Sequence, residues 1–83
     1  MRVRLVFFAA LRERMGARAE RSVEPGTTVG ALWRALVAER PELTRILVRF
    51  AVNEVYVEPG HRLANGDEVA FFPPVSGGAR EAS

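Results

Sequence analysis

One stretch near the C-terminus, residues 68–78, constrains this chain more than any other part of the sequence. Residues 68–72 alternate in the manner of a strand, with Val69 and Phe71 on one face. Pro73 and Pro74 then end the strand, because a proline has no N–H to give to a ladder and holds φ near the polyproline value. A serine and two glycines close the stretch with little bulk. A stiff, uncharged arm of this kind suits insertion into a narrow cleft of another protein, and we prefer that interpretation to a frayed terminus.

The length and composition predict one small domain. A chain of 83 residues has room for a single core, because about 60% of the unfolded surface is buried at this size. No stretch resembles a membrane span, and the alternation begins at once, so we expect neither a membrane anchor nor a signal peptide. The absence of cysteine excludes disulfides and thiolate metal sites and fits a cytoplasmic location. The single histidine, His61, cannot form a metal centre alone, and we expect it in a loop.

All twelve basic residues are arginines, which explains a pI near 10.4 beside a formal charge of only +2. Residues 1–50 hold ten arginines and five glutamates, whereas residues 51–83 hold two arginines and five acids. No basic cluster is interleaved with stacking aromatic residues, so we expect no nucleic-acid partner.

Periodicity predicts the order β-β-α-β-β. The main helix follows a cap at Thr27 or Thr28 and ends before Pro41, and its apolar residues recur at helical spacing. This spacing assigns Trp33 to the core rather than to a binding site. The stripe consists of Val29, Leu32, Trp33, Leu36 and Val37. The four strands of this order are residues 2–8, 19–24, 49–53 and 68–72. Residues 55–57 follow a tight bend at residues 53–54 and form a short fifth strand.

Shorter signals complete the prediction. Residues 9–15 are good helix formers, residues 42–47 form a helical turn, and Asn65-Gly66 is the strongest turn signal. One sheet must cover the stripe of the single long helix, which predicts an α+β fold. Placing the first and last strands as parallel central neighbours gives a β-grasp, a mixed sheet of four to five strands on one main helix. A ferredoxin-like fold would need a second long helix.

Two segments carry a family resemblance. Residues 5–9 (LVFFA) and residues 63–78 (LANGDEVAFFPPVSGG) resemble the small subunits of molybdopterin synthase, the MoaD group of ubiquitin-like β-grasp sulfur carriers. The resemblance spans residues 1–78 and implies one carrier domain whose arm is residues 73–78. Residues 79–83 are then an extension, which we expect to be disordered.

The resemblance implies a chemistry for Gly78. An adenylating enzyme uses ATP to activate the Gly78 carboxylate, sulfur replaces AMP, and a thiocarboxylate results. The carrier then docks on the large subunit, within a heterotetramer that converts cyclic pyranopterin monophosphate to molybdopterin. The carrier itself is a non-catalytic subunit that binds no cofactor and no metal. The arm residues expected to bind within the partners are Pro73, Pro74, Val75, Ser76 and Gly77.

Two phenylalanines are the expected docking residues. Strand alternation places Phe8 on the outward face of the first strand and Phe72 on the outward face of the last. If these strands are neighbours, the two rings form an exposed apolar patch beside the arm, as docking surfaces do. The alternative is that both rings pack under a loop.

The sequence departs from the family pattern after Gly78, where residues 79–83 follow. A peptide-bonded Gly78 has no carboxylate to adenylate. We expect a peptidase to remove the extension; the alternatives are residues added for expression and a protein that has lost carrier activity.

Proteins with other functions share these sequence features. Sulfur carriers for thiamine or for tRNA thiolation have the same fold and Gly-Gly, but the Phe-Phe-Pro-Pro-Val lead-in fits the molybdenum branch better. A ubiquitin-like modifier would join target lysines through Gly78, and the absence of lysine weakens a polymer-tag role. A third class is an interaction module whose blocked tail never reacts.

Overall fold

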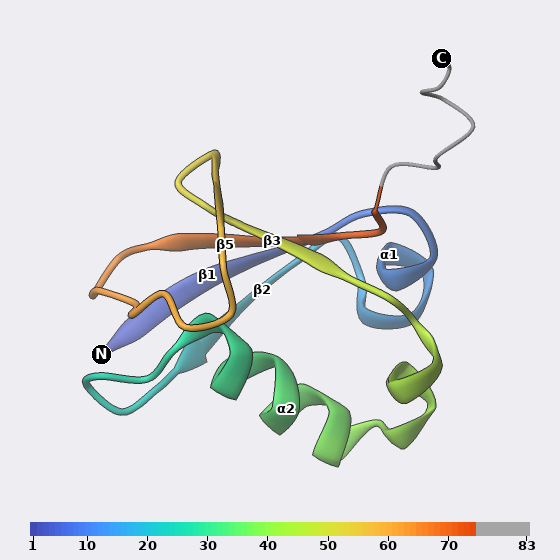
Figure 1. Ribbon diagram of the computed structural model, residues 1–83. Coiled ribbons are helices and arrows are strands. Elements are labelled where there is room, and N and C mark those ends of the chain that lie inside the picture. The colour runs from blue at the N-terminus through green and yellow to red at the C-terminus, as the bar shows by residue number, and fades with distance from the viewer. Residues whose placement is uncertain (75–83) are drawn as a thin grey trace.

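The computed structural model describes residues 1–74 as a five-stranded mixed sheet with one long helix, one short helix and a 3₁₀ helix (Figure 1). In chain order the elements are β1 (Arg2–Phe7), α1 (Ala9–Met15), β2 (Arg18–Ser22), α2 (Val29–Glu39), η1 (Pro41–Arg45), β3 (Arg49–Val52), β4 (Val55–Val57) and β5 (Glu68–Phe72). The predicted α+β class and β-grasp architecture are confirmed. Within residues 1–74, no helix is long and apolar enough to cross a membrane.

The sheet has the order β2-β1-β5-β3-β4. β1 and β5 are parallel and central, as predicted, with Leu5 opposite Val69 and Phe7 opposite Phe71. The other neighbouring pairs are antiparallel. Because β1 and β5 are parallel, their C-terminal ends lie side by side at one end of the sheet, where α1 also lies (Figure 1).

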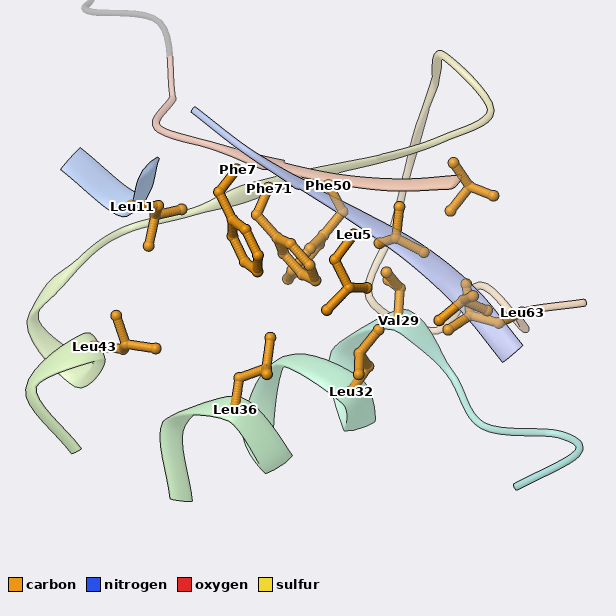
Figure 2. Close-up of a cluster of buried hydrophobic side chains, with 13 residues drawn as sticks. Leu5, Phe7, Leu11, Val29, Leu32, Leu36, Leu43, Phe50, Leu63 and Phe71 are labelled. Carbon is orange, nitrogen blue, oxygen red and sulfur yellow. The ribbon is translucent and has the colours of Figure 1, made fainter. Parts of the chain in front are cut away.

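The core lies between α2 and one face of the sheet. Alternate residues of β1 and β5 point toward the helix, and the α2 stripe meets them (Figure 2). Phe71 is at the centre, with its ring centroid 5.4 Å from that of Phe7, 5.4 Å from Trp33 and 5.7 Å from Phe50. Trp33 is partly buried against this cluster, which confirms its assignment to the core.

Both ends of α2 follow the local sequence. The Thr28 hydroxyl accepts a hydrogen bond from the Ala31 amide at 3.1 Å, so Thr28 is the N-cap. The Gly30 amide donates to the Pro59 carbonyl at 2.9 Å, which joins the loop after β4 to the first turn of the helix. The helix ends at Glu39, and Pro41 begins η1.

Two turns hold the start of β5. The Asn53 side chain donates to an Asp67 carboxylate oxygen at 2.9 Å and accepts from the Glu68 amide at 3.0 Å. The other Asp67 oxygen accepts from the Ala64 amide at 2.7 Å. The predicted turn at Asn65-Gly66 is present, with φ of 86° at the glycine. These bonds fix where the final strand enters the sheet.

Candidate functional site

The face of the sheet opposite α2 carries the candidate site. Residues paired across neighbouring strands project from the same face, so the register identifies which residues share it. Ala51 is paired with both Ala70 and Tyr56, and Arg49 is paired with Phe72. Phe50 and Val52 belong to the core cluster, so the residues that alternate with them point outward.

Two rings meet on this outer face. The Phe72 and Tyr56 ring centroids are 5.4 Å apart with planes inclined at 32°. Ala51 lies on the intervening strand and is 5% exposed although it belongs to the outer face. A small side chain at this position leaves space for the two rings above β3. Tyr56 is 77% exposed, and Phe72 is half-buried.

Phe8 lies at the arm end of the same face. It is the N-cap of α1, with extended backbone, and its amide donates to the Phe71 carbonyl at 3.1 Å. Continuing the register of β1 and β5 therefore places Phe8 beside Phe72. The Phe8 side chain is 47% exposed. β1 ends one residue before the predicted limit because Ala9 turns the chain with a φ of 55°.

Phe8 and Phe72, which alternation predicts to be docking residues, share the outer face with a third ring, Tyr56, and their docking role stays a prediction. We name Phe8, Tyr56 and Phe72 the aromatic patch. Among residues 1–74, the ring that pairs with Phe72 is Tyr56, and the aromatic pairs do not include Phe8. Sequence reasoning assigned residues 55–57 to a strand and missed Tyr56 as a surface residue. The available signal was a lone tyrosine between two valines, directly after a tight turn.

The arm begins where the sequence predicts. β5 ends at Phe72, and Pro73 and Pro74 continue the chain outside the sheet, the first exposed and the second half-buried. Val75, Ser76, Gly77 and Gly78 lie outside the described residues, as does the extension 79–83. Their assignments stay predictions.

A cavity of about 360 Å³ opens beside the base of the arm. Its walls combine two rings of the outer face with a cation and an anion from the ends of β3 and β4. The lining residues are Arg49, Phe50, Tyr56, Val57, Glu58 and Phe72.

Ion pairs lie apart from this cavity. Arg2 and Glu20 approach to 2.7 Å, and the hydrogen bond from Arg2 lowers the pKa of the Glu20 carboxyl. Arg21 binds the Glu39 carboxylate through both terminal nitrogens, which lowers the pKa of Glu39 and raises that of Arg21. In the described part of the chain, no three potential metal ligands gather in one place. His61 lies in an exposed loop, as predicted.

The arrangement is suited to docking. Rings that are exposed on a rigid sheet supply apolar contact area at low entropic cost, because the strands already hold their backbone. Pro73 and Pro74 follow β5 at this end of the outer face and cannot extend the strand.

Known proteins are similar to this chain in sequence and in fold. Residues 5–78 match the model of the ThiS family. The molybdopterin synthase sulfur carrier subunit of Escherichia coli (strain K12) is 39% identical over 80 residues, which are 92% of this chain and 99% of the relative. Small archaeal modifier protein 1 from Haloferax volcanii has a TM-score of 0.77 at 30% identity, covering 89% of this chain and 98% of that one.

A further solved structure has a similar fold. A chain of the complex of subunits 1 and 2 of the molybdopterin-converting factor from Helicobacter pylori 26695 has a TM-score of 0.67 at 24% identity, covering 93% of this chain and 99% of that one. This likeness concerns the fold alone. The family model and the bacterial relative both extend over nearly the whole chain. The chain therefore belongs to the ThiS/MoaD family of ubiquitin-like β-grasp proteins.

Proposed function

We propose that this protein is the sulfur carrier subunit of a molybdopterin synthase. The observation that carries the proposal is the junction at the end of β5. There, a strand held between β1 and β3 ends beside the aromatic patch, and its last residues begin the sequence FFPPVSGG, which lies within the residues that match the family. A relative 39% identical to this chain bears the same name.

The proposed chemistry takes place at the Gly78 carboxyl. Its carboxylate attacks the α-phosphorus of ATP, giving an acyl adenylate and pyrophosphate. A sulfur nucleophile then displaces AMP, which is a far better leaving group than oxide, and a thiocarboxylate is left on the carrier. Transfer of that sulfur to cyclic pyranopterin monophosphate, with water supplying oxygen, restores the carboxylate. ATP is consumed by the adenylating enzyme and is not bound by this chain.

The carrier contributes position rather than catalytic groups. Residues 73–78 can span at most about 20 Å when extended. The aromatic patch holds the domain on its partner while the arm places its terminal sulfur within reach of the substrate, which converts an encounter in solution into a local reaction. General bases and oxyanion donors belong to the partners.

Activation requires a free Gly78 carboxylate. In this sequence Ala79 follows Gly78, so the glycine carbonyl is in a peptide bond. We propose that a peptidase removes residues 79–83 before adenylation. The extension carries Arg80 and Glu81, whose charges would be costly to bury in a cleft shaped for glycines.

A second function is a protein modifier. The observation in its favour is the 30% identity and TM-score of 0.77 to small archaeal modifier protein 1. Such a modifier would pass the same activated Gly78 carboxyl to an amine of a target protein, with loss of AMP. The two functions diverge only in the nucleophile that receives the acyl group.

Reconstitution distinguishes them. Protein ending at Gly78 is loaded by the adenylating enzyme with ATP and a sulfur donor, then mixed with the large subunit and cyclic pyranopterin monophosphate. Formation of molybdopterin in proportion to the loaded carrier supports the proposal, and unloaded carrier serves as the control. If molybdopterin does not form and amide-linked adducts appear on added lysine-containing proteins, the modifier function replaces it.

A further inference from the structure

Arg49 has a defined position at the base of the arm. It is the first residue of β3, lies opposite Phe72 in the antiparallel register and is exposed. Phe50 is opposite Val57 on the other side, so the same register places Glu58 across from Arg49. A cation and an anion therefore lie side by side on neighbouring strands, and Phe72 flanks Arg49 on its other side. These three residues and Tyr56 line the cavity beside the arm.

The two charges do not form an ion pair with each other. Within residues 1–74 the ion pairs closer than 4.0 Å are Arg2–Glu20, Arg18–Glu68 and Arg21–Glu39. The Arg49 side chain is thus exposed beside the cavity of about 360 Å³, whose lining includes the rings of Tyr56 and Phe72. A partner that covers Phe72 and Tyr56 must also displace water from the Arg49 guanidinium.

The energetics of that step restrict the partner. Removing water from a cation costs several kcal/mol unless a charged partner replaces it. Arginine compensates best with a carboxylate, because its planar fork binds the two oxygens together. The rings beside it offer a complementary site for an apolar side chain. The matching surface is a carboxylate flanked by an apolar residue.

We infer that Arg49 is a specificity residue, and that it binds a carboxylate of the synthase large subunit while a neighbouring apolar side chain of that subunit enters the cavity that Tyr56 and Phe72 line. The inference rests on the proposed function. The large subunit is the chosen partner because the bacterial relative is named as a subunit of the synthase, and a desolvated charge pair belongs in a lasting interface.

Three variants test this pairing. Arg49→Gln removes the charge and keeps much of the side-chain stem. Arg34→Gln is the matched control, since Arg34 is exposed on α2, which covers the other face of the sheet. Glu58→Gln tests whether Arg49 instead pairs with its own neighbour on docking. Binding of each to the isolated large subunit is measured by calorimetry at low and high salt, with thermal melting to verify folding.

Arg49→Gln is expected to weaken binding roughly tenfold to hundredfold and to flatten its salt dependence. Arg34→Gln is expected to bind as the unaltered protein does. Glu58→Gln is expected to bind at least as tightly, because it removes a negative charge beside the carboxylate that Arg49 would bind. Equal affinity of Arg49→Gln and the unaltered protein overturns the inference, as does a loss in Glu58→Gln matching that in Arg49→Gln.

The same measurements distinguish failure of the proposed function from failure of the Arg49 inference alone. If unaltered protein does not bind the large subunit, both the function and the inference are overturned. If it binds and supports molybdopterin formation while Arg49→Gln behaves identically, only the inference falls. The inference is also overturned if Arg49→Gln binds the large subunit normally and is impaired only in its reaction with the adenylating enzyme.

Discussion

The ring of Phe72 lies against the ring of Tyr56 above β3, with centroids 5.4 Å apart. The two residues come from β5 and β4, which are separated by β3 in the sheet. Ala51 of β3 is almost fully covered beneath them. Aromatic pairs of this kind contribute roughly 0.5–1.5 kcal/mol beyond the area that they bury. Most of the patch is thus held in place before a partner binds.

Tyr56→Ala is expected to weaken binding to the large subunit more than it weakens the fold. Tyr56 is 77% exposed, so its removal uncovers little core, whereas truncating an interface aromatic typically costs about 2 kcal/mol of binding. Calorimetry and thermal melting measure the two effects. Tyr56→Phe is the control and should retain binding. A large drop in melting temperature with unchanged affinity would show that the ring is structural.

Phe8→Ala and Phe72→Ala are expected to lower the affinity for the large subunit by about 2 kcal/mol or more each. The matched control is Phe71→Ala, because Phe71 is adjacent in sequence but fully buried at the centre of the core. That change should cost about 3–5 kcal/mol of unfolding free energy. If Phe8→Ala or Phe72→Ala collapses stability and spares binding, the rings belong to the core and the docking assignment is wrong.

Gly30→Ala is expected to destabilise the fold. A Cβ at this position would lie 3.0 Å from both the Cβ and the carbonyl oxygen of Pro59, and that oxygen accepts the Gly30 amide. Overpacking of this kind costs about 1–3 kcal/mol, which exceeds the helix-propensity gain of up to about 1 kcal/mol. Gly60→Ala, where nothing lies within 4 Å, should be neutral or stabilising. Urea denaturation compares the two. Equal stability of both variants would contradict the contact.

The Arg21–Glu39 pair predicts a pH dependence of stability. The pKa of Glu39 is lower in the folded state, because its carboxylate accepts hydrogen bonds from Arg21. Its contribution is therefore present above the ordinary carboxyl pKa and is lost as pH falls through the lowered folded value. The stability difference between the unaltered protein and Glu39→Gln should shrink from about pH 7 to about pH 3.

Glu13→Gln provides the comparison for this effect, since Glu13 is exposed and belongs to none of the ion pairs found in residues 1–74. High salt should reduce the Glu39 effect, because the Glu39 side chain is 54% exposed. A difference between Glu39→Gln and the unaltered protein that stays constant with pH would mean that the ion pair does not contribute.

Much of the fold follows from local pattern. Alternation in residues 68–72 and the helical spacing of Val29, Leu32 and Leu36 each identify one buried face, and a single sheet can cover one such helix. The parallel pairing of β1 and β5 then follows from the order of elements. The Pro73-Pro74 stop marks the end of the last strand. The strand, the helix stripe and the proline stop depend on neighbours in sequence, and the pairing of β1 with β5 follows from how those elements can pack.

The site was only partly predictable. Tyr56 and Phe72 are 16 positions apart and meet because β3 lies between their strands with a small residue, Ala51, at the crossing. No periodicity encodes that contact. The positive φ of Ala9 is similarly set by tertiary structure, because an alanine gives no local signal for the left-handed region. Long-range packing therefore decided the shape of the patch.

Intact-mass spectrometry of the carrier after incubation with the adenylating enzyme, ATP and a sulfur donor tests the central claim most directly. Protein ending at Gly78 is expected to gain about 16 Da, as sulfur replaces a carboxylate oxygen through the activated acyl intermediate. Gly78→Ala in the same trimmed form should gain it more slowly, because a methyl group is added where the partners fit closely. Protein that retains residues 79–83 should gain nothing. Addition of the same mass with the extension still attached, or no addition to the trimmed protein, would contradict the assignment of Gly78 as the sulfur-carrying terminus.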